Sequence, residues 1–517
     1  MRTTIFRLPP LASPAALTIG SLWLAACTVG PTYPGPPDAA PQSTAAGQFR
    51  RAAPTNNTAA PPARWWDALK DPVLTSLIDR ALAHSPTLRA AQARVLEARA
   101  TVRRDQAAGL PSATATGIAV AANVPAGSPL AGLGGSSGSS ASSGAAGSDS
   151  SSRESFNFYS AGFDALWELD LFGGVRRSVE GARANAGVTE ARLQDAQVQL
   201  AAEVGQAYVS LRGQQALLAL ARSDEANQQK LLALTEARVR GGTAARFDVE
   251  RATSQLIATR ANAAPLPGQV AQSLDRLALL AGQEPGTLDG LLLPEAPLPV
   301  LPEAVSLGDP AAMLRRRPDV RAAERALAAS SAGIGQAIAQ RFPSVTLFGN
   351  IGFSNGQFPK LFDVNSLAVL GGPVLRWNFL NFGKTEGAID QSRAANEEAL
   401  ANYDAMVLAA LQDAESSLAR FGQQRQTVYQ RMDALSSAER TVDLANVRYL
   451  GGTATLLDVL TAETQKVQIE QTLAQSRAML VTDYVSLQKS LGLGWQPVAD
   501  ADAGAPSTSA AIAPVTP

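Results

Sequence analysis

The residue of this 517-residue chain with the most specific chemistry is its single cysteine, Cys27. It directly follows Leu24-Ala25-Ala26 and closes a mostly apolar stretch of small residues, which arginines precede. A basic start, an apolar stretch and small residues at its end are typical of a secretory signal peptide, and a cysteine at that place resembles a bacterial lipobox. We therefore predict a lipoprotein signal peptide over 1–26 and lipidation (palmitate) of the Cys27 thiol. The alternative is an ordinary cleaved signal with an incidental cysteine.

No other set of side chains predicts catalysis or metal binding. The only histidine is His84, and with one cysteine in the chain neither an intrachain disulfide nor a metal site with a second His or Cys can form. We interpret His84 as a surface or helix-entry residue. Lys and Arg total 44 against 45 Asp and Glu, without a basic cluster, which argues against a nucleic-acid partner. We therefore expect no enzymatic activity and no cofactor.

The chain is internally duplicated. The segment Arg238–Thr243 recurs 210 residues later as Arg448–Thr453, and at the same shift Trp167, Phe172, Gly173 and Asp248 recur as Trp377, Phe382, Gly383 and Asp458. Before the predicted strands the shift is 232, because Pro86, Pro111 and Ser112 recur as Pro318, Pro343 and Ser344. A Gly/Ser-rich insert over 127–152 accounts for the difference. A repeat this long indicates duplicated architecture rather than a solenoid.

The duplication predicts the domain organisation. We expect a lipidated N-terminal linker over 27–64, a first repeat over 65–285 and a second repeat over 286–495. The linker is rich in Pro, Ala and Thr, and a similar composition marks a tail over 496–517. Such segments should be disordered or lie along a surface.

Each repeat should contain a long helical hairpin. The stretches 174–238 and 383–449 contain no proline, and apolar or small residues recur in them at steps of three or four. About 65 residues of helix would span roughly 100 Å. A second helical pattern follows each Gly-Gly pair, over 247–280 and 456–491, so the Gly-Gly pair should form the turn.

Between the helices lie four segments in which apolar and polar residues alternate, over about 112–120, 156–169, 344–353 and 367–379. Their length suits strands that cross a bilayer, and aromatic residues gather at one end of them, as in an interfacial girdle. The alternative is a small amphipathic sheet on a soluble domain. Four strands cannot close a barrel, and an open edge in lipid is costly. Three chains would supply twelve strands, so the predicted fold is mainly α with a membrane β-barrel portion shared by a trimer.

These features together resemble the TolC-like outer membrane efflux proteins, specifically the lipoprotein branch that serves RND-type pumps (the NodT type). The resemblance covers nearly the whole chain after Cys27. The segments that carry it, beside the two Arg-x-x-Gly-Gly turns, are Cys27–Tyr33, Trp65-Trp66, Asp71-Pro72, Asp79–Leu82, Leu314–Val320, Ala323–Arg325, Gly335–Ala337 and Phe342-Pro343.

The resemblance implies a homotrimer in the cell outer membrane, lipid-anchored and extending into the periplasm as a barrel of twelve helices. It further implies passive export of drugs, solvents or metals that arrive from an inner-membrane RND pump through a periplasmic adaptor. A trimeric coiled-coil lipoprotein with a structural or adhesive role is the alternative, although it would need neither spanning strands nor matched hairpins.

The two Gly-Gly turns are the predicted adaptor-docking tips, because glycine permits positive φ and a close approach of a partner's backbone. Capping of the helix ends is the simpler role of these glycines and is compatible with docking. The predicted tip residues are Arg238, Gly241, Gly242, Thr243, Arg448, Gly451, Gly452 and Thr453.

By the same resemblance, residues just beyond the second tip should narrow the pore. The predicted gate consists of Leu457, Asp458 and Thr461. Three Asp458 carboxylates around one axis would repel each other, raise some of their pKa values and attract cations. The family often has a second acidic residue where this chain has Thr461. The alternative is that Asp458 is an exposed helix charge, and its repeat mate Asp248 should lie on the outer hairpin.

Overall fold

The computed structural model describes residues 28–52, 59–125 and 153–495. Cys27, the predicted signal peptide, the insert over 127–152 and the predicted tail over 496–517 lie outside the described residues. The chain forms two compact units. Among the described residues, the sheet unit combines 28–35, 97–125, 153–186 and 325–400, and the helix unit combines 36–52, 59–96, 187–324 and 401–495. Each unit contains parts of both repeats, so the repeats are not separate compact domains.

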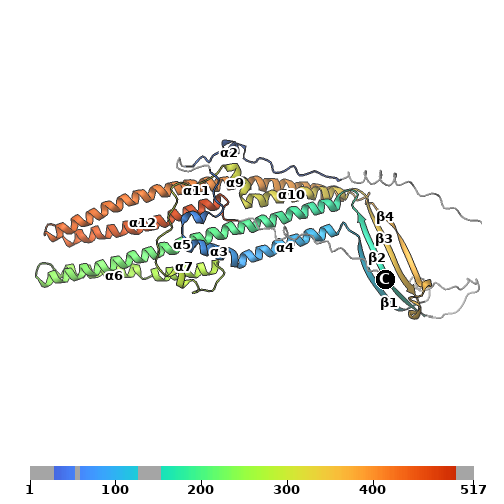
Figure 1. Ribbon diagram of the computed structural model, residues 1–517, viewed down its shortest axis with the longest axis horizontal. Coiled ribbons are helices and arrows are strands. Elements are labelled where there is room, and N and C mark those ends of the chain that lie inside the picture. The colour runs from blue at the N-terminus through green and yellow to red at the C-terminus, as the bar shows by residue number, and fades with distance from the viewer. Residues whose placement is uncertain (1–27, 53–58, 126–152, 496–517) are drawn as a thin grey trace, which may run out of the picture. The chain divides into compact units, whose positions relative to one another are not determined.

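The strands of both repeats form one antiparallel sheet. The strands are β1 (Ser112–Pro125), β2 (Arg153–Leu169), β3 (Ser344–Asn355) and β4 (Leu367–Arg376), and they pair in the order β1-β2-β3-β4 (Figure 1). All four lie where the alternation of the sequence predicts strands. The ends differ: β1 continues five residues beyond the predicted end at 120, and β4 stops at Arg376 instead of 379. In the described residues β1 and β4 each have one unpaired edge.

The two faces of the sheet differ in polarity. Because side chains alternate along a strand and the register pairs Phe163 with Ile351 and Ile351 with Val369, these three residues share one face. All three side chains are exposed. On the opposite face the Asp164 carboxylate accepts hydrogen bonds from Thr116 Oγ1 and Asn350 Nδ2, both at 2.7 Å. One apolar and one polar face are what a strand between lipid and a lumen requires.

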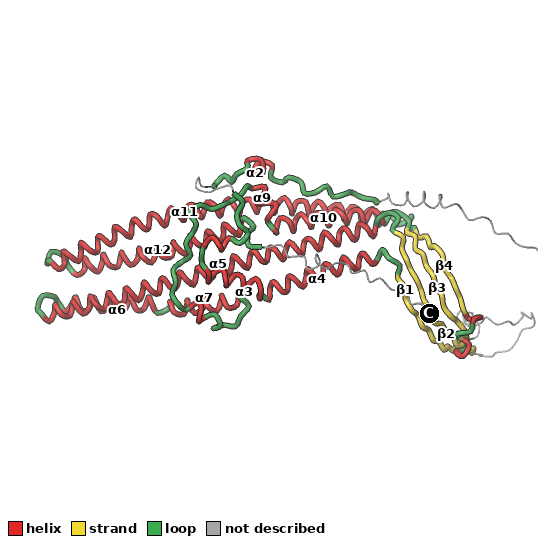
Figure 2. Tube along the Cα trace, in the orientation of Figure 1, coloured by secondary structure: helices red, strands yellow, loops and turns green. Residues whose placement is uncertain are grey.

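Two helices of equal length dominate the rest of the chain. They are α5 (Gly174–Arg240) and α11 (Lys384–Leu450), with 67 residues each. Each turns back at its Gly-Gly pair, into α6 (Arg246–Ala263) and α12 (Leu456–Ser490) respectively (Figure 2). The predicted return helix over 247–280 is interrupted at Pro265, after which α7 (Leu266–Leu280) begins. Among the described residues, none of the helices combines the length and the apolar character needed to cross a bilayer.

The remaining helices are shorter. They are α2 (Pro41–Ala46), η1 (Trp65–Leu69), α3 (Pro72–His84), α4 (Pro86–Ala107), α8 (Asp289–Leu292), α9 (Pro310–Arg316), α10 (Pro318–Ala339), η3 (Phe358–Lys360) and η4 (Val364–Ser366). His84 is exposed at the C-terminal end of α3, rather than at a helix entry.

The main core of the helix unit surrounds two neighbouring tryptophans. Trp65 and Trp66 are fully buried and meet edge to face, with ring centroids 5.5 Å apart. Trp65 also packs edge to face against Tyr484 of α12. Buried leucines of α3 and α5 complete this cluster. Large aromatic side chains contribute most to such a core because they bury the largest area.

The N-terminal linker makes fixed contacts with each unit. In the sheet unit, Val29 N–H donates to Phe172 O at 3.2 Å, and the Arg177 guanidinium donates to Val29 O and Gly30 O. In the helix unit, Phe49 is buried, and the backbone N–H groups of the next two residues donate to the Glu415 carboxylate. Of the two predicted states, the described part of the linker therefore adopts the surface-bound one.

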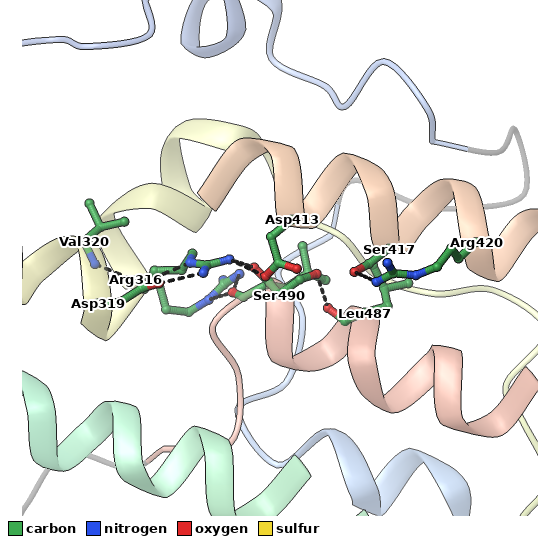
Figure 3. Close-up of polar contacts among 10 residues, drawn as sticks. Arg316, Asp319, Val320, Asp413, Ser417, Arg420, Leu487 and Ser490 are labelled. Carbon is green, nitrogen blue, oxygen red and sulfur yellow. Dashed lines mark hydrogen bonds and ion pairs between the residues drawn. The ribbon is translucent and has the colours of Figure 1, made fainter. Parts of the chain in front are cut away.

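The motif Leu314–Val320 anchors the C-terminal end of α12 (Figure 3). Arg317 donates from Nη1 to Ser490 O at 2.6 Å and binds the Asp319 carboxylate through Nε and Nη2, while Arg316 donates to Leu491 O. The last carbonyls of a helix have no partner within the helix and carry its negative dipole end. The guanidinium groups of Arg316 and Arg317 therefore supply hydrogen-bond donors and positive charge to these carbonyls. They fix the C-terminal end of α12, whose N-terminal end bears the predicted gate.

Removing this anchor should destabilise the helix unit. Arg317→Ala is expected to cost about 3 kcal/mol of unfolding free energy, because it leaves a largely buried partner charge without its ion pair. Thermal unfolding of the purified protein, followed by circular dichroism, measures the effect. Arg315→Ala is the matched control, because Arg315 is an exposed arginine at the end of α9, just before the anchor. An equal loss in both variants would contradict the anchor.

The anchor also predicts a pH dependence. Burial raises the pKa of the Asp319 carboxyl, but the hydrogen bonds and charge of Arg317 outweigh it, so that pKa lies below its ordinary value. A lowered pKa stabilises the fold above the ordinary Asp pKa, and this contribution is lost as the pH falls through the lowered one. The stability difference between wild type and Arg317→Ala should therefore shrink in acid.

Candidate docking tips and gate

The two predicted tips have the same backbone geometry. At the first tip the N–H groups of Gly241, Gly242 and Thr243 donate to carbonyls of the last turn of α5 at 2.9–3.0 Å. At the second tip the corresponding bonds to the last turn of α11 measure 2.9–3.1 Å, and in both tips the threonine hydroxyl also donates to the arginine carbonyl at 3.1 Å. Both tips lie at the same end of the helix unit (Figure 1).

The second glycine of each pair allows the turn. Gly242 and Gly452 both have φ +72°, a left-handed conformation that glycine adopts without steric cost. A Cβ at either position would meet no atom within 4 Å. The backbone of each tip is therefore open to an approaching partner, and the glycines also terminate their helices as the simpler interpretation requires.

The two tip arginines differ in environment, which the sequence does not predict. The guanidinium of Arg238 lies 4.2 Å from the ring centroid of Tyr449, whereas Arg448 is exposed. Position 239, the repeat mate of Tyr449, is a valine, which offers Arg448 no aromatic ring in return. A cation above an aromatic ring contributes roughly 0.5–2 kcal/mol. Arg238 therefore links the tip of the first hairpin to the tip of the second.

The predicted gate residues share the exposed side of α12. Leu457 is 49 % exposed, and Asp458 and Thr461 are exposed as well. The intervening residues Leu456, Val459 and Leu460 are buried in a small apolar cluster with Tyr449. The first turn of α12 thus fixes its apolar side against α11 and leaves the three gate residues outside the core.

Asp458 has a local partner that the gate hypothesis did not include. Its Oδ2 accepts hydrogen bonds from Thr455 N and Thr455 Oγ1, both at 2.8 Å, while Thr455 Oγ1 accepts from the Asp458 N–H. These bonds, the backbone bond most of all, lower the pKa of Asp458. The mate carboxylate of Asp248 accepts the Ala245 N–H at 3.2 Å, without a hydroxyl at the capping position. The Thr-x-x-Asp spacing is a capping-box pattern that the sequence already contained.

The aromatic residues at the end of the strands have a structural role at the helix–strand junction. Trp167 Nε1 donates to Gly109 O at 3.0 Å, and Trp377 Nε1 donates to Arg341 O at 3.2 Å. The two tryptophans and the two acceptors are repeat mates. Trp377 is the first residue after β4, and its indole binds the helix–strand junction at the point where the strand ends.

Comparisons with known proteins agree with this architecture. The profile of the outer membrane efflux protein family matches residues 77–283 and 310–493, one segment within each predicted repeat. Nodulation protein T of Rhizobium leguminosarum bv. trifolii is 28 % identical over 93 % of this chain and 97 % of its own length. The pyoverdine export outer membrane protein OpmQ of Pseudomonas aeruginosa is 32 % identical over 87 % of this chain and 92 % of its own. The solved structure of the outer-membrane channel OprN superimposes with a TM-score of 0.81 at 32 % identity and covers 91 % of this chain and 100 % of its own.

Proposed function

Because this chain belongs to the outer membrane efflux protein family, we propose that it is the outer membrane channel of a tripartite, RND-type efflux system. It would be a passive conduit for drugs, solvents or metals that an inner-membrane pump delivers through a periplasmic adaptor. The observation that carries this proposal is the combination of an open sheet with one apolar face and two hairpins with matching tips. A structural or adhesive coiled coil needs neither feature.

The open sheet supports a homotrimer. In the described residues, the free edges of β1 and β4 carry backbone groups that would cost several kcal/mol each if they stayed unpaired in lipid. Pairing β4 of one copy with β1 of the next removes both edges, and three copies would close a twelve-stranded barrel. The apolar face with Phe163, Ile351 and Val369 would then meet the lipid.

The matching tips support docking to an adaptor. Three copies would present six tips with nearly the same backbone, and the open space above Gly242 and Gly452 leaves room for a partner's backbone. Exposed tip residues such as Arg448 and Thr453 would supply polar contacts. The stacking of Arg238 on Tyr449 makes the two kinds of tip chemically distinct, so we expect the adaptor to contact them unequally.

The proposed gate consists of Leu457, Asp458 and Thr461 of each copy, arranged around the pore axis. Their exposure on one side of α12 supports it, since that side needs another surface or the lumen to face. The cap formed with Thr455 orients the Asp458 carboxylate instead of neutralising it. Three such charges would attract cations and disfavour anions.

We also propose that Cys27 anchors the protein by acyl chains in the outer membrane. The residues directly after it support this, because Val29 and Gly30 are bound to Arg177 of the sheet unit. Cys27→Ala is expected to abolish incorporation of labelled palmitate and to leave trimers in the outer membrane, because assembly depends on the strands. Metabolic labelling followed by gel electrophoresis measures both. Label that persists in the variant would contradict the lipoprotein assignment.

Export is tested in a strain that lacks this chain. Deletion should sensitise the cells to at least one class among antibiotics, organic solvents and metal salts, and the wild-type chain should restore resistance. Intracellular accumulation of the toxic compound should rise and fall accordingly. Unchanged sensitivity and accumulation across all three classes would contradict a role in efflux, whereas loss of adhesion alone would favour the coiled-coil alternative.

A further inference from the structure

The two repeats of the chain are alike down to single atomic contacts. Where residues of one repeat make a contact and their mates in the other repeat do not, the mates can be asked whether they contact a second copy of the chain. Both tryptophan indoles bind the corresponding carbonyl across the helix–strand junction. Both hairpin tips have the same hydrogen bonds within 0.1 Å. A contact between two residues of the chain thus predicts a contact between their two repeat mates.

Two of the contacts that join the first repeat to the second within a chain have mates that can be compared. In the sheet unit, Phe172 stacks on Phe342, with ring centroids 4.7 Å apart and planes 14° from parallel. In the helix unit, Arg321 Nη1 donates to Gln194 Oε1 at 2.8 Å. Each contact pairs a residue in or just before α5, the long helix of the first repeat, with a residue in or just after α10 of the second repeat.

The mates of the two stacked rings are present but do not meet a comparable partner in the described chain. Phe172 corresponds to Phe382, and Phe342 to Leu110. Phe382 is 92 % exposed and Leu110 is 64 % exposed. Phe382 also has φ +50°, which is uncommon for a residue other than glycine. An exposed aromatic side chain in a strained conformation is best explained by a neighbour that holds it.

The repeat mates of Arg321 and Gln194 would form a different kind of contact. Gln194 corresponds to Asp404 and Arg321 to Arg89, and two alanines follow each of these arginines. Asp404 is half-buried like Gln194, and Arg89 is exposed like Arg321. Neither Arg89 nor Asp404 makes an ion pair within the part of the chain that the structure describes. The second copy of the contact would therefore be a charged pair, which is stronger than a neutral hydrogen bond.

We propose that neighbouring copies of this chain meet through a second version of its own inter-repeat contact. Asp404 of one copy pairs with Arg89 of the next, and Phe382 of one copy packs on Leu110 of the next. This inference rests on the trimer proposed above and specifies its interface. Within one chain the two repeats are joined covalently, but neighbouring chains are not. The charged pair would attract neighbouring chains to each other and fix how their helices align.

Charge reversal tests the helix contact in the full-length protein. Asp404→Arg and Arg89→Asp should each lower the fraction of trimer that survives detergent at a fixed elevated temperature roughly tenfold, by the usual coupling of contacting residues. The combination of both substitutions should restore most of it. Exposed pairs are screened by salt, so the losses should diminish at high ionic strength. If each single substitution destabilises the trimer and the double variant does not recover, Asp404 and Arg89 do not form the proposed pair.

Oxidative crosslinking tests the sheet contact. Copies with Leu110→Cys, co-expressed with differently tagged copies with Phe382→Cys, should form covalent dimers of mixed tags, because only adjacent cysteines form a disulfide. Phe172→Cys with Phe342→Cys in one chain is the matched control and should crosslink within the chain, without forming a covalent dimer. If the control crosslinks and no mixed dimers form, Phe382 does not pack on Leu110 of the next copy. That result would favour lipid as the neighbour of Phe382.

The wild-type protein separates this inference from the proposed function. A wild-type trimer, together with failed rescue and failed crosslinking, overturns the interface and leaves the trimer intact. A wild-type protein that is monomeric in the outer membrane overturns both.

Discussion

Gly452→Trp is expected to reduce drug resistance to the level of the deletion strain while the outer membrane retains nearly the normal amount of protein. The indole would project into open space above the tip, because a Cβ at this position meets no atom within 4 Å. That space is where we propose that the adaptor packs. The left-handed φ of +72° adds a backbone cost of about 1 kcal/mol, which a large domain tolerates. Resistance and in vivo crosslinking to the adaptor measure the effect.

A second glycine with the same properties supplies the control. Gly47 has φ +67°, and a Cβ at its position would also meet no atom within 4 Å, but it follows α2, far along the sequence from either tip. Gly47→Trp should carry the same backbone cost and leave export intact. If both variants lose export equally, the loss reflects folding rather than docking, and the docking proposal fails.

Leu457→Ala is expected to open the proposed gate enough to admit a large antibiotic such as vancomycin, and to increase single-channel conductance severalfold. The side chain is 49 % exposed and the neighbouring Leu456 and Val459 form the apolar contacts of this turn, so little stability should be lost. Asp458→Asn tests the charge of the same ring. It should reduce cation selectivity and block by multivalent cations, because three negative charges would be removed from the constriction.

The choice of asparagine separates charge from capping. The side-chain amide in Asp458→Asn retains an oxygen that can accept from the Thr455 N–H, whereas Asp458→Ala removes charge and cap together and should lower helix stability further. Asp248→Asn is the matched variant on the first hairpin and should leave selectivity unchanged. Altered selectivity in Asp248→Asn, with none in Asp458→Asn, would mean that the inner and outer hairpins are interchanged.

The regular elements were predictable because their signals are local and repeated. A long stretch without proline that ends in Gly-Gly predicts a helix and its turn, and α5 and α11 begin and end within about two residues of the predicted limits. The strand ends were less predictable. Trp377 belongs to the alternating pattern, yet it lies beyond β4 and donates to Arg341 O, a tertiary contact that a pattern in one segment cannot contain.

The functional surfaces were predictable only in part. The sequence predicted the two Gly-Gly turns and the start of α12, on which Leu457, Asp458 and Thr461 are exposed, because glycine conformation and helix periodicity are local. It missed the stacking of Arg238 on Tyr449, since nothing in either segment indicates that the two hairpins meet there. The Thr455 cap on Asp458 has a local signal, the Thr-x-x-Asp spacing, and does not depend on a pore. The roles of these residues in docking and gating stay predictions.

Copies of this chain should assemble into a transmembrane channel. Planar-bilayer recording tests this most directly. The sample is the purified, full-length protein, taken from fractions that migrate as heat-modifiable trimers in detergent gels. We predict discrete conductance steps that favour cations and that increase in size in the Leu457→Ala variant. Trimers that insert into the bilayer and conduct no ions, in the wild type and in Leu457→Ala alike, would contradict the channel and favour a structural coiled-coil protein.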